Sequence, residues 1–237
     1  MDEIVTKACR ETEIYLRNNV DGILIENMHD IPYIQSRDFQ PDTVACLARI
    51  CTEVKKITPP NFPIGLQVLA GGNKEAIAIA KACSLAFIRA EGYVFGHVAD
   101  EGYIDANAGA LLRYRKTIEA NDVQIFTDIK KKHSSHAITS DVSLTETAKA
   151  AEFFLADGLI LTGISTGSPV DVKELNDVKR NCDLPILIGS GITSENLCNY
   201  REANAFIVGS SFKKDGLWMN ELDEMRIKNF MDKLFML

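Results

Sequence analysis

Short apolar segments alternate with amphipathic helical segments along this chain, and this alternation constrains the fold more than any other feature. The apolar segments are continuous runs rather than alternating ones, which is typical of parallel strands that are buried on both faces. The expected strands are Gly22–Glu26, Pro63–Leu69, Ala86–Arg89, Val123–Ile129, Gly158–Leu161, Leu184–Ile188 and Ala205–Val208. Regular alternation of strands and helices predicts a parallel α/β architecture.

The helical segments and the chain length narrow this prediction. Helical periodicity is found at 40–57, 73–83, 105–119, 143–155, 171–180 and 194–200, with a last helix near 221–236. Ser143-Leu-Thr-Glu146 has the sequence of a capping box. With 237 residues, of which 46% are hydrophobic, the chain is close to the roughly 250 residues of a (β/α)8 barrel. We predict a single domain, residues 1–237, with the α/β fold of a TIM-type (β/α)8 barrel.

Three pairs of strands resemble each other across the sequence, each pair four strands apart. Asp21-Gly-Ile-Leu-Ile resembles Asp157-Gly-Leu-Ile-Leu, Pro63-Ile resembles Pro185-Ile, and Ala86-Phe-Ile resembles Ala205-Phe-Ile. This pattern indicates two similar half-barrels. The strand Val123–Ile129 has no such partner, and the sequence begins directly in an amphipathic helix. We therefore expect the first barrel strand to be missing from this chain.

Charge and composition exclude several classes of protein. The net charge of −7 and a pI near 5.2 disfavour a partner that is nucleic acid or an anionic membrane surface. No apolar run approaches the roughly 20 residues of a membrane span, and the N-terminus resembles neither a signal peptide nor a transit peptide. The six cysteines lack metal-type spacing and are expected to be reduced. We expect an intracellular, cytoplasmic protein, or a mitochondrial one if an N-terminal segment is missing.

Two turns rich in glycine and serine follow the last two expected strands and predict a phosphate site. The first contains Gly189, Ser190 and Gly191, and the second contains Gly209 and Ser210. Glycine lets backbone N–H groups approach an anion closely, and the start of a following helix would add partial positive charge. In a (β/α)8 barrel the last two strands build a phosphate site in this way. Two ordinary strand-to-helix turns are the alternative.

Charged side chains at other strand ends predict an acid–base cluster, because a parallel barrel has its active site at the carboxyl ends of its strands. Glu26, Arg89, Asp128 and Lys130 are the expected catalytic residues. Lys130 is two residues beyond Asp128, which predicts that both lie on the same strand face. The expected substrate contacts are Asn27, His133, Thr162 and Thr166. Alternatively, Glu26 and Asn27 cap a loop, and Arg89 pairs with Glu26 or Asp128.

The four histidines and one long loop leave further alternatives open. His29, His97, His133 and His136 fall in or near strand-to-helix loops, but their spacing is not that of a metal site, so none is predicted. The glycine-hinged segment from Glu91 to Asp105 is either a lid or a packed loop that contacts another subunit. The second alternative implies a homo-oligomer.

Several motifs taken together resemble the BtpA family, also called BtpA/SgcQ, over nearly the whole chain. They are Glu26-Asn-Met-His-Asp30, Phe87-Ile-Arg-Ala-Glu91, Leu112-Arg-Tyr-Arg115, Asp128 with Lys132-His133, Thr162-Gly-x-x-Thr166-Gly-Ser168, Gly189-Ser-Gly191 with Glu195-Asn196, and Ile207-Val-Gly-Ser-Ser-Phe-Lys213-Lys-Asp-Gly216. Members of this family resemble ribulose-phosphate-binding TIM barrels. They usually begin with a strand that carries a His-x-x-Pro-Leu-Pro-Gly-like segment, which this sequence lacks.

The resemblance implies two alternative functions. One is an enzyme, or a protein derived from an enzyme, that acts on a small phosphorylated metabolite such as a sugar or nucleoside phosphate, with lyase-, isomerase- or nucleosidase-like chemistry. The other is a non-catalytic assembly or stability factor, because the cyanobacterial branch is associated with photosystem I. Asp128-x-Lys130 resembles part of a decarboxylase motif, but position 133 is His, so the decarboxylase activity does not carry over.

Overall fold

The computed structural model describes residues 1–237, which form two compact units. Unit 1 comprises Met1–Arg89 and Ala110–Gln124, and unit 2 comprises Ala90–Gly109 and Ile125–Leu237. Parallel strands alternate with helices in both units, as the sequence predicts.

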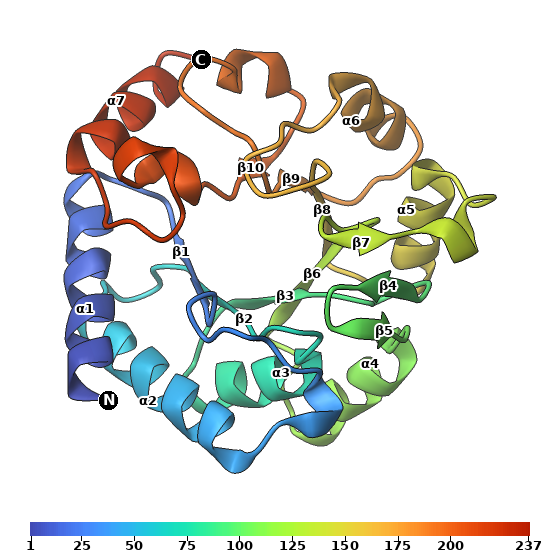
Figure 1. The fold of residues 1–237 in the computed structure, drawn as a ribbon, viewed down its shortest axis with the longest axis horizontal. Helices are drawn as coiled ribbons and strands as arrows, with labels where there is room; N and C mark the ends of the chain where they lie inside the picture. Colours follow the sequence, from blue (N-terminus) through green and yellow to red (C-terminus); the bar gives the residue numbers. More distant parts are fainter. The chain divides into compact units, whose positions relative to one another are not determined.

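Unit 1 is built on three parallel strands in chain order: β1 (Ile23–Glu26), β2 (Ile64–Gln67) and β3 (Phe87–Ala90). Its helices are α1 (Asp2–Arg17), α2 (Pro41–Ile57) and α3 (Asn73–Ala82), and most of α4 (Ala108–Thr117) also belongs to it. Figure 1 shows α1, α2 and α3 side by side in chain order. The apolar stripe of α2, including Cys51 and Val54, is buried, so this helix is held by packing rather than by propensity alone.

Unit 2 is built on four parallel strands: β6 (Gln124–Asp128), β8 (Gly158–Leu161), β9 (Ile186–Ile188) and β10 (Ala205–Phe206). Its α-helices are α5 (Leu144–Phe153), α6 (Val172–Lys179) and α7 (Glu224–Leu234). The predicted capping box is present: Ser143 accepts from the Glu146 N–H, and Glu146 accepts from the Ser143 N–H. The strand and helix bounds differ from those predicted by a few residues at most.

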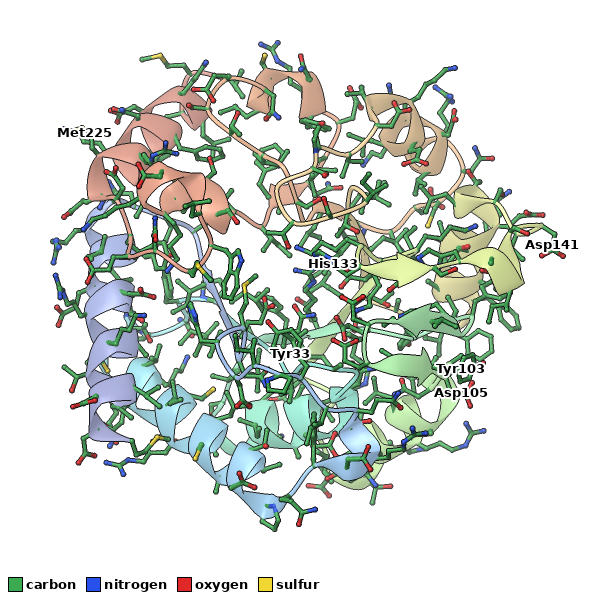
Figure 2. The ribbon with its side chains drawn as sticks, viewed as in Figure 1. Tyr33, Tyr103, Asp105, His133, Asp141 and Met225 are labelled. Carbon is green, nitrogen blue, oxygen red and sulfur yellow. The ribbon has the colours of Figure 1, made fainter.

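A second sheet in unit 2 was not predicted. It has three short antiparallel strands in the order β5-β4-β7, where β4 is His97–Ala99, β5 is Gly102–Ile104 and β7 is Ser134–Ser135. Figure 1 shows this small sheet beside β6 and α5, and Figure 2 places Tyr103 on one edge strand and His133 at the start of the other. The segment from Glu91 to Asp105 is therefore a packed hairpin, and the prediction of a loop is wrong.

The prediction of a helix at 194–200 is also wrong. Only a single 3-10 turn, Leu197–Tyr200, is present there, and another 3-10 turn, Ser210–Phe212, follows β10. Asn196 directly precedes this turn, and its side chain accepts from the Thr193 N–H and donates to the Gly191 carbonyl, which favours a turn over a helix at 191–196. The partial positive charge of a helix start, which we expected beside both glycine-serine turns, is therefore not supplied.

The predicted repeat is confirmed for two of its three pairs. Ile23 N–H donates to the Pro63 carbonyl at 3.1 Å, and the equivalent Leu159 N–H donates to the Pro185 carbonyl at 2.8 Å. The third pair is shifted by one residue: Phe87 lies opposite Gly65 in β2, whereas Ala205 lies opposite the equivalent Leu187 in β9. Phe87 therefore matches Ala205, not Phe206, and the similarity between the two Ala-Phe-Ile segments is not structural.

Candidate functional site

A small polar pocket lies in unit 2 at the carboxyl end of β6. Its polar lining comes from Asp128, Lys130 and Lys131 at the end of β6 and just after it, from His97 of the small sheet, from His136 just after β7, and from Thr139 and Thr147. Its remaining lining is Gly92, Val94, Phe95 and Gly96. The inner space accommodates a group about the size of one water molecule. Polar side chains on such a pocket select a polar ligand group rather than an apolar one.

His97 occupies the central strand of the small sheet and points to its buried face. The burial pattern of β4 is buried, exposed, buried, so His97 and Ala99 face inward while Val98 faces solvent. His97 is 4% exposed, and its Nε2 atom has no hydrogen-bond partner in the protein. Burial lowers the pKa of His97 to about 4; Lys131 and His136 lower it as well, while Asp128 opposes this. The imidazole is therefore neutral at pH 7.

Two contacts hold the other basic groups of the pocket. Lys131 Nζ forms an ion pair with Glu91 Oε1 at 3.1 Å, and both side chains are largely buried. His136 Nε2 donates to the Lys131 carbonyl at 3.0 Å, because a carbonyl oxygen can only accept. The rings of His97 and His136 are 5.5 Å apart between centroids. These contacts join the hairpin to the segment after β6, so the pocket walls support each other.

Asp128 and Lys130 line the same pocket, as predicted, but the predicted reason is wrong for Lys130. The strand β6 ends at Asp128, and Lys130 has a φ of 46°, so it is not on a strand face. Its Nζ atom donates to the Thr139 carbonyl at 3.3 Å. Asp128 is buried at the strand end. A turn, not strand alternation, thus brings the ammonium group to the pocket.

The three predicted substrate contacts of unit 2 join two neighbouring loops. Thr166 N–H donates to His133 Nε2 at 3.2 Å, which places the ring proton on Nδ1. The Lys132 N–H donates to Thr162 Oγ1 at 2.9 Å. Burial, together with Lys132, lowers the pKa of His133. In this structure His133, Thr162 and Thr166 hold the loop after β6 against the loop after β8.

The first glycine-serine turn is used partly for internal contacts. Ser190 Oγ accepts from the Gly163 N–H at 2.7 Å and donates to the Ser168 carbonyl at 2.8 Å, while the Gly189 N–H donates to the Leu161 carbonyl. A Cβ at Gly191 would lie 2.4 Å from the Pro169 backbone, and its φ is +69°. Gly191 is therefore required by the close approach of the 168–169 backbone.

The ends of β9 and β10 still present several open backbone donors. The N–H groups of Gly191, Gly209 and Ser210 donate to no acceptor within the protein. Phe206 pairs with Ile188, so the turns that contain Gly191 and Gly209 follow the ends of two neighbouring parallel strands. A Cβ at Gly209 would meet nothing within 4 Å, so the space beside it is open. Adjacent unpaired N–H groups beside open space are suited to an anion.

Three predicted site residues lie in unit 1. Glu26 ends β1, and Arg89 lies within β3 and is 5% exposed. Asn27 joins two loops, because its side chain accepts from the Leu69 N–H at 2.8 Å and donates to the Leu69 carbonyl at 3.3 Å. Asn27 thus has the loop-capping role that we considered as the alternative. The catalytic roles of Glu26 and Arg89 stay predictions.

His97 and His136 are the functional candidates that the sequence prediction missed. Both were weighed as metal ligands but neither was predicted as a site residue, and the structure contains no cluster of three or more His, Cys, Asp or Glu that could hold a metal ion. The pattern His97-Val98-Ala99, with a polar residue at an inward position of a short strand, was the available signal.

Among the helices of this protein, none has the length and the apolar composition of a membrane span.

Comparison with solved structures defines the class of fold. The chain is similar to N-(5'-phosphoribosyl)anthranilate isomerase from Pyrococcus furiosus, with a TM-score of 0.61 and 15% identity, over 98% of this chain and 96% of that one. At this identity the similarity concerns the fold alone. The predicted fold is confirmed: the chain is a TIM-type α/β barrel protein.

The protein belongs to the BtpA family, whose match covers residues 1–235. An uncharacterized mitochondrial protein of Caenorhabditis elegans is 47% identical over 98% of this chain and 84% of its own length. The photosystem I biogenesis protein BtpA of Synechocystis is 32% identical over 98% of this chain and 79% of its own length. The resemblance inferred from the sequence motifs is thus confirmed.

Proposed function

We propose that this protein binds a small phosphorylated metabolite in unit 2, with the phosphate group at the carboxyl ends of β9 and β10. The observation that carries the proposal is the set of open N–H groups of Gly191, Gly209 and Ser210. Backbone N–H groups bind phosphate without side-chain charge, which suits a chain with a net charge of −7. The protein shares its TIM-type fold with N-(5'-phosphoribosyl)anthranilate isomerase, and this similarity supports a phosphorylated ligand.

The same proposal assigns acid–base chemistry to the pocket after β6. Asp128 supplies a carboxylate and Lys130 an ammonium group on one small cavity. A carboxylate and an ammonium group that face one ligand can remove a proton from one atom and deliver a proton to another. This chemistry is that of an isomerase or a lyase acting on a carbon chain next to a phosphate. The compartment is the cytoplasm or, as for the worm relative, the mitochondrion.

The experiment measures phosphate binding by isothermal titration calorimetry in the wild type, Gly209→Ala and Gly209→Val. A Cβ at position 209 would meet no protein atom within 4 Å, so we expect a small side chain to fit the fold there and to fill the space of the anion. We expect n-pentyl phosphate to bind the wild type and to bind Gly209→Val at least about tenfold more weakly, with Gly209→Ala in between. The exposed Leu217→Ala variant is the control and should bind as the wild type does.

Equal affinity of the wild type and Gly209→Val would contradict the phosphate site. Thermal unfolding gives a second measurement, because a ligand at 100 times its Kd adds about 2.7 kcal/mol to the free energy of unfolding. No stabilisation by any phosphate ester would also contradict the proposal.

A non-catalytic assembly factor is the second candidate, and one surface feature favours it. Phe153 and Leu155 at the end of α5 are 81% and 67% exposed. Exposed apolar side chains of this size are typical of protein contacts. If Phe153→Ser abolishes a complex that forms with the wild type while phosphate binding is absent, the assembly function is the better explanation.

A further inference from the structure

We propose that His97 Nε2 binds one hydroxyl group of the metabolite, and that this contact selects a polyhydroxylated carbon chain over an apolar one. The inference rests on the proposed function, since it concerns the other end of the same ligand. The observation behind the inference is the state of one atom: His97 lines the pocket, and its Nε2 atom is buried and has no hydrogen-bond partner in the protein.

A buried polar atom without a partner costs free energy, so native proteins rarely keep one without a reason. Glu91 pairs with Lys131 and His136 donates to a carbonyl, so the neighbouring polar groups of the pocket are satisfied by protein atoms. His97 is not satisfied in this way. A ligand group that enters the pocket supplies the missing hydrogen bond.

The size of the pocket defines the ligand group. The inner space accommodates about one water-sized group, which corresponds to a single hydroxyl and excludes a ring or a phosphate. A neutral imidazole suits a neutral hydroxyl, because it needs no counter-charge to bind. The groups that act on the charge of this imidazole are Lys131, His136 and Asp128, and burial, together with Lys131 and His136, favours its neutral form.

The position of the pocket defines the length of the ligand. The strand order β6-β8-β9-β10 places the phosphate site two to three strand spacings, roughly 10–14 Å, from the end of β6. A phosphorylated chain of about five carbons, with one hydrogen bond at each end, spans this distance. The structure therefore favours an open-chain sugar or polyol phosphate as the ligand class.

The experiment compares D-ribitol 5-phosphate with n-pentyl phosphate by isothermal titration calorimetry. Both have five carbons and one phosphate, and only the first has hydroxyl groups. We expect the wild type to bind ribitol phosphate at least about tenfold more tightly than pentyl phosphate, because one or two hydrogen bonds distinguish them. His97→Leu should lose this preference and keep its affinity for pentyl phosphate.

Two further variants separate a binding role from a structural one. The Gln amide reaches the position of Nε2 and the Asn amide does not, so His97→Gln should keep part of the preference and His97→Asn should lose it. If His97→Leu fails to fold, His97→Gln and His97→Asn test the inference in its place. Val98→Thr changes the solvent face of the same strand and should behave as the wild type.

The outcomes separate this inference from the proposed function. If pentyl phosphate binds and the preference for ribitol phosphate is absent in the wild type, or is unchanged in both His97→Leu and His97→Asn, the inference is wrong and the phosphate site stands. If neither ligand binds the wild type, the proposed function fails and the inference fails with it.

Discussion

The helices of unit 1 and unit 2 begin in different ways. In unit 1, α1, α2 and α3 start without any side-chain cap, whereas α5, α6 and α7 of unit 2 start at Ser143, Asp171 and Asp223, whose side chains accept backbone N–H groups. The strands of the two units nevertheless share one geometry, in which Gly22 and Gly158 each approach a proline carbonyl. Local side-chain contacts therefore fix the helix starts of unit 2, and those of unit 1 depend on packing.

The loops that follow the strands show the same contrast. Asn27 joins the loops after β1 and β2 in unit 1, and Ser190 joins the loops after β8 and β9 in unit 2. In unit 2 this arrangement lies beside open N–H groups and a polar pocket. Similar half-barrel strands can therefore carry loops with different functions, because the strands fix only where the loops start.

The largest expected effect concerns the two glycines at the ends of β9 and β10. Gly191→Ala should lower the free energy of unfolding by about 3 kcal/mol or more, because its Cβ would overlap the Pro169 backbone and its φ is positive. Gly209→Ala should change it by less than about 0.5 kcal/mol, since the added Cβ meets nothing. Urea unfolding measures both, and equal effects would show that the two turns are equivalent.

The pH dependence of stability should reveal the buried imidazole of unit 2. The pKa of His97 is about 4 in the folded protein, against 6.5 for an ordinary histidine, so between these values the unfolded state binds a proton that the folded state does not. The free energy of unfolding should therefore fall as pH falls through this window, by on the order of 3 kcal/mol.

His97→Gln should flatten this dependence when unfolding is measured in urea from pH 7 to pH 4. The matched control is His29→Gln, because His29 is exposed and is the histidine of unit 1. An unchanged slope in His97→Gln would mean that other groups cause the acid sensitivity.

The two side chains that join loops should differ in their contribution to stability. Ser190 is buried, and Ser190→Ala, which leaves the Gly163 N–H without its acceptor, should cost about 1–3 kcal/mol. Asn27→Ala should cost less, about 1 kcal/mol, because Asn27 is only half-buried and water can replace part of its contacts. Thermal unfolding of both variants tests this order; a larger loss in Asn27→Ala would reverse it.

The smallest effects concern the helix starts. Ser143→Ala should destabilise the protein by about 1 kcal/mol, since it removes the capping box of α5. Gln40→Asp should stabilise it by about 0.5–1 kcal/mol, because position 40 has extended backbone angles at the start of α2 and no side-chain cap. If Gln40→Asp has no effect, the backbone N–H groups at the start of α2 already have partners. The contrast between the helix starts of the two units is then smaller than the caps indicate.

The sequence alone determined the parallel strands, most of the helices and the family. Gly158–Leu161 was predicted with its observed bounds, and the capping box at Ser143 was predicted with both hydrogen bonds. These features were accessible because each depends on residues within a few positions of one another. The glycine-serine turns were likewise visible in the sequence, since a turn is a local structure.

Only the tertiary structure decided which side chains form the pocket and which hold the loops together. The strands β4, β5 and β7 have two or three residues each, too few for a periodic signal, and β4 pairs with a segment more than 30 positions away. The same holds for Ser190, whose hydroxyl is used by Gly163 and Ser168, and for His97, whose Nε2 atom meets no partner. Burial and hydrogen bonding depend on contacts between distant segments, and these contacts exist only once the chain has folded.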